Sequence, residues 1–282
     1  MRYAHVGTSG LEVSRLVLGM MSFGDTSQRA WHVGLDAARP LVRRAAEAGV
    51  TAYDTADYYD RGVNEEVTGR LLRELYRAGR TTCCRPRCTT RCRGLPATAA
   101  CRGATSSPRS TARSGGSAPT TSKAQHVAEG NGWHRFVAMQ NHYHLAYREE
   151  EREMVPLCLD QGVGVLPYSP LARGLHTGTR TRGGGGATIR SDNDPAATAL
   201  YSDADFDVVD RLVEVARELG RPPAEVALAW LRDRAGVSAP VVGVTKGPHL
   251  EDALESLDLE LSREECARPE AAYVPHPVAG PE

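Results

Sequence analysis

The residues that could do chemistry begin with a cluster of aspartates and tyrosines in the segment VTAYDTADYY. Asp54 and Tyr59 lie in this segment, after a short apolar stretch. Carboxyl and phenol groups can take or give protons, and polar groups at the C-terminal end of a buried strand indicate an active site. Taken alone, the pair is more typical of a strand-end acid and a tyrosine at the edge of a core.

Two histidines, His142 and His144, form the pattern QNHYH. We expect the two side chains to alternate along a strand and so to face opposite sides. The pattern therefore argues against a paired metal site, and it leaves open that one of the two lines a substrate cleft. The acidic run REEEREM, which begins at Arg148, is more typical of a solvated helix face than of a site.

Residues 81–121 differ in composition from the rest of the chain. They hold five of the seven cysteines and seven arginines, without any acid, aromatic residue, Ile or Val. With Leu95 as its only large aliphatic residue, this segment cannot bury enough apolar surface to offset the entropy of ordering, and we expect it to be disordered.

The cysteines and arginines of this segment do not favour a metal or nucleic-acid site. Cys84, Cys88 and Cys92 could share a metal only on a helix, and Pro86 lies among them. Zinc ligands usually come as two closely spaced pairs. The arginines could attract phosphates, but no aromatic side chain lies between them to stack on a base. We predict neither a metal nor a nucleic-acid partner.

Composition places the chain among globular proteins. It has 282 residues, of which 41% are hydrophobic, and a formal net charge of −1. This balance gives no chain-wide attraction to nucleic acid or to a membrane surface. The sequence has no run of eighteen apolar residues and no signal-peptide pattern, so we expect a soluble, cytoplasmic protein with Cys158 and Cys266 as reduced thiols.

The elements that must position these residues alternate between strand and helix. Nearly all-apolar strands of this kind are buried on both faces, as in a parallel sheet, and the number of units favours a (β/α)₈ barrel. The expected strands cover 15–24, 50–59, 163–174 and 238–245. The expected helices cover 37–49, 64–79, 148–162, 203–220, 222–236 and 249–257, and residues 122–143 form helix, turn and strand.

Five motifs in this order resemble the aldo-keto reductases, in the bacterial branch related to the potassium-channel β subunits. They are TSGLEVSRLVLGMMSFG, YDTADYYDRGVNEEVTGRLL, FVAMQNHYHLAYREEEREMVPLC, GVGVLPYSPLARG and PVVGVTKGPHLEDALESLDLELSREE. The resemblance implies a (β/α)₈ TIM barrel that uses NADP(H) to reduce an aldehyde or ketone, here incomplete in the middle. It predicts one domain over 1–282, ordered in 1–80 and 123–282 and aberrant and disordered in 81–122.

The resemblance assigns roles to part of a catalytic tetrad. Asp54 and Tyr59 match its aspartate and tyrosine, so Tyr59 would be the general acid that protonates the carbonyl oxygen. The lysine and histidine, expected at the ends of the next two strands, are missing. The only lysines in the chain are Lys123 and Lys246.

Positions that match the family's cofactor contacts are better preserved. Gln140 matches the glutamine that holds the nicotinamide carboxamide, and Tyr168 matches the aromatic residue that stacks under the nicotinamide ring. The remaining matches are Met20, Met21, Asp54, Ser169, Pro170, Leu171, Arg173, Arg190, Gly243, Thr245, His249 and Asp252.

A reading-frame error would explain residues 81–122. With high-GC codons, moving the frame by one base turns ACRGATSSPRST into GLSRRHILAEID and SAPTTS into LGTDYV, which match family elements in the right order. We therefore predict a frameshift, followed by a jump near Ser122 that removed the histidine strand. Two functions remain: a reductase of a small carbonyl substrate, or a non-catalytic relic of the fold that at most binds nucleotide. Neither the substrate's identity nor the oligomeric state can be read from the sequence.

Overall fold

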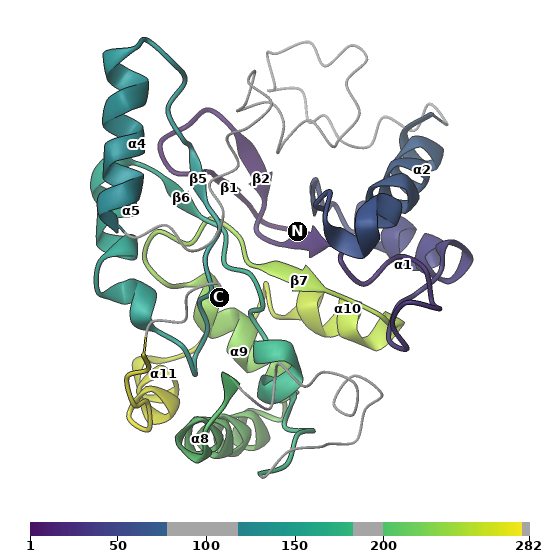
Figure 1. The fold of residues 1–282 in the computed structure, drawn as a ribbon. Coiled ribbons are helices and arrows are strands. Elements are labelled where there is room, and N and C mark those ends of the chain that lie inside the picture. Colours follow the sequence, from purple (N-terminus) through teal and green to yellow (C-terminus); the bar gives the residue numbers. More distant parts are fainter. Residues whose placement is uncertain (78–117, 183–199, 278–282) are drawn as a thin grey trace.

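The centre of the protein is an arc of short parallel strands. The computed structural model describes residues 1–77, 118–182 and 200–277, and within these ranges the arc runs across the middle of the molecule (Figure 1). Its strands are β3 (Val17–Gly19), β4 (Ala52–Asp54), β5 (Ala138–Met139), β6 (Gly164–Val165) and β7 (Val241–Gly243). An antiparallel hairpin of β1 (Tyr3–His5) and β2 (Glu12–Ser14) precedes them.

The pairing of these strands follows the order of a barrel. β3 pairs in parallel with both β4 and β7, and β5 pairs in parallel with β6. A parallel bridge between Val165 and Val237 joins the two groups, and the Val241 amide donates to the Pro167 carbonyl at 2.8 Å. The order is therefore β5-β6-β7-β3-β4. The last strand of the chain thus lies beside the first of the arc, which is the neighbour relation found in a (β/α)₈ barrel and fits the predicted α/β fold with parallel strands.

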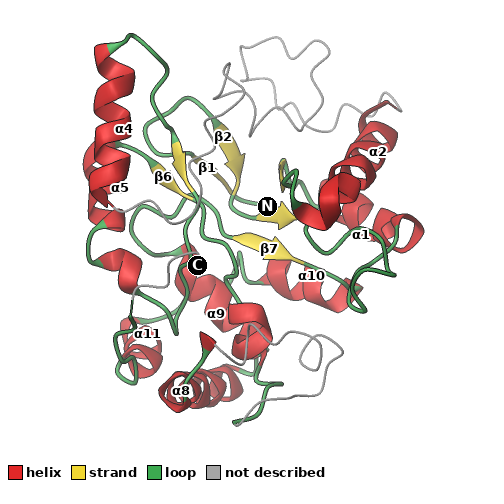
Figure 2. Ribbon diagram, in the orientation of Figure 1, coloured by secondary structure: helices red, strands yellow, loops and turns green. Residues whose placement is uncertain are grey.

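Helices lie around the outside of these strands (Figure 2). They are α1 (Leu35–Glu47), α2 (Val63–Arg77), α4 (Ala118–Gly130), α5 (Met154–Gln161), α8 (Asp203–Leu219), α9 (Pro223–Arg232), α10 (Gly247–Glu255) and α11 (Arg263–Glu270). Three short 3₁₀ helices complete the described elements: η1 (Tyr59–Gly62), η2 (Glu149–Glu151) and η3 (Ala172–Thr177). No helix in the described ranges is both long and apolar enough to cross a membrane.

Side chains of the central strands alternate between two hydrophobic clusters, as the pleat of a strand requires. One face packs against the N-terminal hairpin through Val6, Val13, Val17, Ala52 and Val241. The opposite face packs against α1, α2 and α10 through Leu18, Tyr53 and Val242. This two-sided burial explains why the strands are apolar in both alternating positions.

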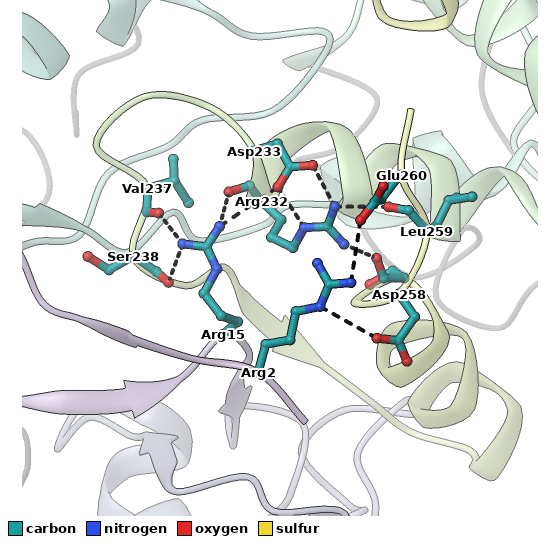
Figure 3. A network of polar contacts seen from close by, with 10 residues as sticks. Arg2, Arg15, Arg232, Asp233, Val237, Ser238, Asp258, Leu259 and Glu260 are labelled. Atoms are coloured by element: carbon teal, nitrogen blue, oxygen red, sulfur yellow. Dashed lines mark hydrogen bonds and ion pairs between the residues drawn. The ribbon is translucent and has the colours of Figure 1, made fainter. Parts of the chain in front are cut away.

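A buried arginine network ties together the end of the arc where the strands begin (Figure 3). The Arg232 side chain is 3% exposed and donates to the carbonyls of Ser256, at 2.6 Å, and Leu259, at 2.9 Å. Arg15, just before β3, donates to the carbonyls of Val237 and Arg232. These bonds satisfy backbone carbonyls that have no partner in a strand pairing. The network therefore stabilises the fold at the end of the arc opposite to the polar strand ends.

The predicted alternation of strands and helices is confirmed, with three corrections. The N-terminal hairpin and α11 were not foreseen. Helix α4 begins at Ala118, four residues before the expected start at Ser122, and the sequence has a proline at position 119, which suits the first turn of a helix. The prediction for residues 81–117 lies outside the described residues.

The third correction concerns the acidic run that starts at Arg148. The chain forms the short η2 there, and Glu149 is only 7% exposed. Its Oε1 accepts hydrogen bonds from the Tyr273 hydroxyl at 2.7 Å and from the His276 amide at 2.9 Å. The run is therefore not a solvated helix face, because the C-terminal segment folds over it.

Candidate active site

The predicted site residues gather where the parallel strands end. Asp54 and Gly243 are the register partners of Gly19, so the ends of β4, β3 and β7 lie side by side. Gln140 follows β5, and its Nε2 donates to Asp54 Oδ1 at 2.9 Å. β4 and β5 are the two outer strands of the described arc, so this hydrogen bond joins its edges.

Asp54 is partly buried and has a neutral partner. Burial raises the pKa of its carboxyl group, and the hydrogen bond from Gln140 lowers it in part. Within the described ranges, no basic side chain forms an ion pair with Asp54. The site thus holds a carboxylate whose charge is only weakly compensated.

Tyr59 opens η1, directly beyond the turn that follows β4. Burial raises the pKa of its phenol well above the ordinary value of 10, and the charge of Asp54 and the adjacent Tyr58 raise it further. Its ring lies 4.7 Å from the ring of Tyr58, centroid to centroid. A phenol in this setting holds its proton tightly, so it can donate a hydrogen bond but is a weak acid.

Two side chains that sequence reasoning missed hold the loops around Asp54 and Tyr59. Asn64 is fully buried, and its Nδ2 donates to the carbonyls of Met20 and Phe23, both at 2.5 Å. Asp60 accepts from the amide of Asp25 at 2.7 Å and has a left-handed backbone, with φ 49°. Such backbone angles at a non-glycine residue are uncommon and often accompany functional sites, which is a signal the sequence does not carry.

The loop after β6 also has an unusual backbone. Ser169, Ala172 and Arg173 all have φ near +50°. Tyr168 precedes this loop and is bridged to His142, three residues beyond the end of β5. The side chain of Leu171 packs against both large hydrophobic clusters. The predicted pyrophosphate loop is therefore a turn whose conformation is held by packing against the core.

The two histidines of QNHYH lie together, which contradicts the expectation that they face opposite sides. His142 Nε2 and His144 Nε2 are 3.0 Å apart. The expectation was wrong because residues two apart on a strand, such as His142 and His144, point to the same side. The chain turns after them, with paired backbone hydrogen bonds between His144 and Tyr147. No group of three or more His, Cys, Asp or Glu in the described part of the chain is arranged to hold a metal ion.

The residues predicted for the adenosine end cluster at the start of α10. The Thr245 hydroxyl and His249 Nδ1 are 3.3 Å apart, and Asp252 follows one turn later. Burial lowers the pKa of His249 and raises that of Asp252. A helix N-terminus favours phosphate through its free amides and its dipole, so this position suits an anion.

The positions of three further predicted cofactor contacts differ from those of the residues above. The Met20 side chain is fully buried in the cluster under α1 and α2, so it packs the core, whereas Met21 is partly exposed. Arg190 lies outside the described residues.

Comparison with known proteins gives a family. The profile described as "Aldo/keto reductase family" matches residues 15–105 and 110–274. Versiconal hemiacetal acetate reductase of Aspergillus parasiticus is 29% identical over 351 aligned positions, covering 99% of this chain and 98% of the relative. A putative aryl-alcohol dehydrogenase of Schizosaccharomyces pombe is 30% identical over 347 positions, covering 99% and 97%. A second one from that yeast is 42% identical over 157 positions, covering 55% of this chain and 47% of its own length.

Proposed function

This chain belongs to the aldo/keto reductase family, and from that premise we propose that it uses NADP(H) to reduce a small aldehyde or ketone, with Tyr59 as the proton donor. The observation that carries the proposal is the gathering of Asp54, Gln140 and Gly243 at one end of the parallel arc. In barrels of this kind, the active site lies at the C-terminal ends of the strands.

The residues present fit the cofactor at both of its ends. Tyr168 would face the nicotinamide, and the start of α10 would hold the adenosine phosphate. Gln140 uses Nε2 to bond Asp54, which leaves its Oε1 able to accept from the carboxamide. When bound, the cofactor supplies the hydride, and the residues of this chain orient the carbonyl and provide the proton.

The proton step is the weak part of this site. Tyr59 must give its proton to the carbonyl oxygen as negative charge develops there, but burial and Asp54 hold that proton on the phenol. A nearby ammonium would favour the ionised phenol and make Tyr59 a better acid. We therefore expect reduction at a rate about 10²–10⁴-fold below that of a site with such support.

A second function, nucleotide binding without catalysis, is favoured by a different observation. Asp54 has only the neutral Gln140 as a partner in the described ranges. In addition, two of the alignments span 351 and 347 positions, more than the 282 residues of this chain, which supports the loss of an internal segment. Such a relic would bind NADPH without turning it over.

One comparison separates the two functions. NADPH oxidation at 340 nm with an aromatic aldehyde is measured for the chain as it stands and for a version rebuilt with the shifted-frame segment and the absent histidine strand. We expect a trace rate from the first, ordinary turnover from the second, and loss of that turnover on Tyr59→Phe. Equal rates in the two proteins would contradict the account of the proton step. NADPH binding without any Tyr59-dependent turnover in the chain as it stands would favour the relic.

A further inference from the structure

We propose that His142 is a positioning residue that holds the ring of Tyr168 in the plane required for binding the nicotinamide end of the cofactor. The inference rests on the proposed function, since it presupposes a nicotinamide cofactor. It starts from a bridge that pairs the backbones of His142 and Tyr168 just beyond the C-terminal ends of neighbouring strands.

The imidazole of His142 packs on two phenol rings. It stacks on Tyr168 with centroids 5.2 Å apart and planes 14° apart, and on Tyr147 with centroids 4.7 Å apart and planes 25° apart. His142 therefore covers one face of Tyr168, and Tyr147 packs against His142 in turn.

Two further histidines lock this stack against rotation. His142 Nε2 meets His144 Nε2 at 3.0 Å, and the fully buried ring of His144 packs edge-on against His176, with centroids 5.0 Å apart. His176 Nδ1 donates to the carbonyl of Pro170 at 3.2 Å. The three histidines thus connect the ring of Tyr168 to the backbone carbonyl of Pro170. They hold the predicted cofactor loop at both of these residues.

The charge state of the histidines suits this role. Burial lowers the pKa of His142 and of His176 to about 4, and it lowers that of His144 well below the ordinary value. All three rings are therefore neutral near pH 7, and one N–H between His142 and His144 can be donated to the other ring's lone pair. Neutral rings stack on phenols without bringing a charge next to the nicotinamide.

The test compares two ligands that share the adenosine end. NADPH carries the nicotinamide, whereas adenosine 2′,5′-bisphosphate lacks it. Dissociation constants are measured for the whole chain by the quenching of tryptophan fluorescence and, for NADPH, by the change in nicotinamide emission. The variants are His142→Leu, which removes the ring, and His142→Phe, which keeps a stacking ring but not the hydrogen bond. His126→Leu on the exposed face of α4 is the matched control.

A positioning role predicts a selective loss. His142→Leu should weaken NADPH binding about threefold to tenfold, the range of one aromatic contact, and change the nicotinamide emission, while adenosine 2′,5′-bisphosphate binds as before. His142→Phe should restore most of the NADPH affinity, and His126→Leu should change neither ligand.

Four results would overturn the inference. Unchanged NADPH binding in His142→Leu would show that the ring does not act through Tyr168. An equal loss for both ligands would show a general structural role. If the unmodified chain binds NADPH no more tightly than adenosine 2′,5′-bisphosphate, the nicotinamide adds no affinity. The inference then fails, while nucleotide binding stands. If it binds neither ligand, the proposed function fails with it.

Discussion

Replacing Asp54 by asparagine tests directly whether this chain has a cation at the centre of its site. The side chain is partly buried, and the Gln140 amide donates a hydrogen bond to it at 2.9 Å. Asparagine has nearly the same shape and can still accept that bond through its Oδ1. The substitution therefore removes the charge and little else.

The size of the effect follows from two opposing contributions. A hydrogen bond to a charged acceptor stabilises by about 1.5–3 kcal/mol and a neutral one by about 1 kcal/mol, so the weaker bond costs stability. Removing the desolvation penalty of a buried carboxylate, several kcal/mol when complete, acts in the other direction. Because Asp54 keeps some exposure, we expect Asp54→Asn to raise the free energy of unfolding by about 1–2 kcal/mol at pH 8.

The pH dependence gives the prediction its signature. Burial raises the pKa of Asp54 in the folded protein above 3.8, so the folded state takes up its proton more readily than the unfolded chain. The contribution of Asp54 to stability is therefore full below that value and is lost as the pH rises through the folded pKa. The advantage of asparagine should be large at pH 8 and should fade toward pH 4.

Urea unfolding followed by tryptophan fluorescence measures this difference, with the buried Trp230 as a probe. The matched control is Asp36→Asn on α1, whose side chain is 92% exposed and pairs with Arg39 at 2.7 Å. It should change stability by less than about 1 kcal/mol. A loss of about 3–5 kcal/mol in Asp54→Asn would refute the reasoning, because that is the cost of breaking a buried ion pair and would reveal a cation beside Asp54.

Two further predictions concern stability and the gene. Arg232→Met should lower the free energy of unfolding by about 2–6 kcal/mol, because it leaves the carbonyls of Ser256 and Leu259 without their donor, at about 1–3 kcal/mol each. Arg2→Met, whose side chain is 49% exposed, should lower it by less than about 1 kcal/mol. Similar values in urea unfolding would contradict the burial argument. Sequencing of the coding DNA should show an open frame in the shifted register across codons 81–121, and a stop codon in that register would exclude the frameshift.

The gathering of Asp54, Gln140 and Gly243 could be predicted from the sequence because it depends on one rule. Residues that follow parallel strands meet at the same edge of the sheet, whatever the lengths of the connections. The strands are short and apolar enough to be recognised without knowing their partners. The same rule gave the position of Tyr168, which bridges to His142, three residues beyond the end of β5.

The surroundings of these residues could not be predicted, because they depend on where a strand stops and what folds over it. β5 ends after Met139, three residues before His142, and strand boundaries leave little trace in composition. Glu149 is buried by contacts with Tyr273 and the His276 amide, more than a hundred residues away. No local pattern carries such contacts, so an acidic run there resembles a solvated face.

The structure separates binding from proton transfer along the chain. The groups that would hold the cofactor belong to β5, β6 and α10, and the core fixes them: His142 stacks on Tyr168, and Leu171 packs on both large clusters. Proton transfer depends instead on what stands beside Asp54, at the outer edge of β4, where the described chain offers only the amide of Gln140. An amide can satisfy the carboxylate's hydrogen bonding but cannot supply the positive charge that would favour an ionised Tyr59. Loss of one internal segment would therefore remove the positive charge that makes Tyr59 a better acid, while leaving the residues that would hold the cofactor in place. Cofactor affinity should therefore survive changes that abolish turnover.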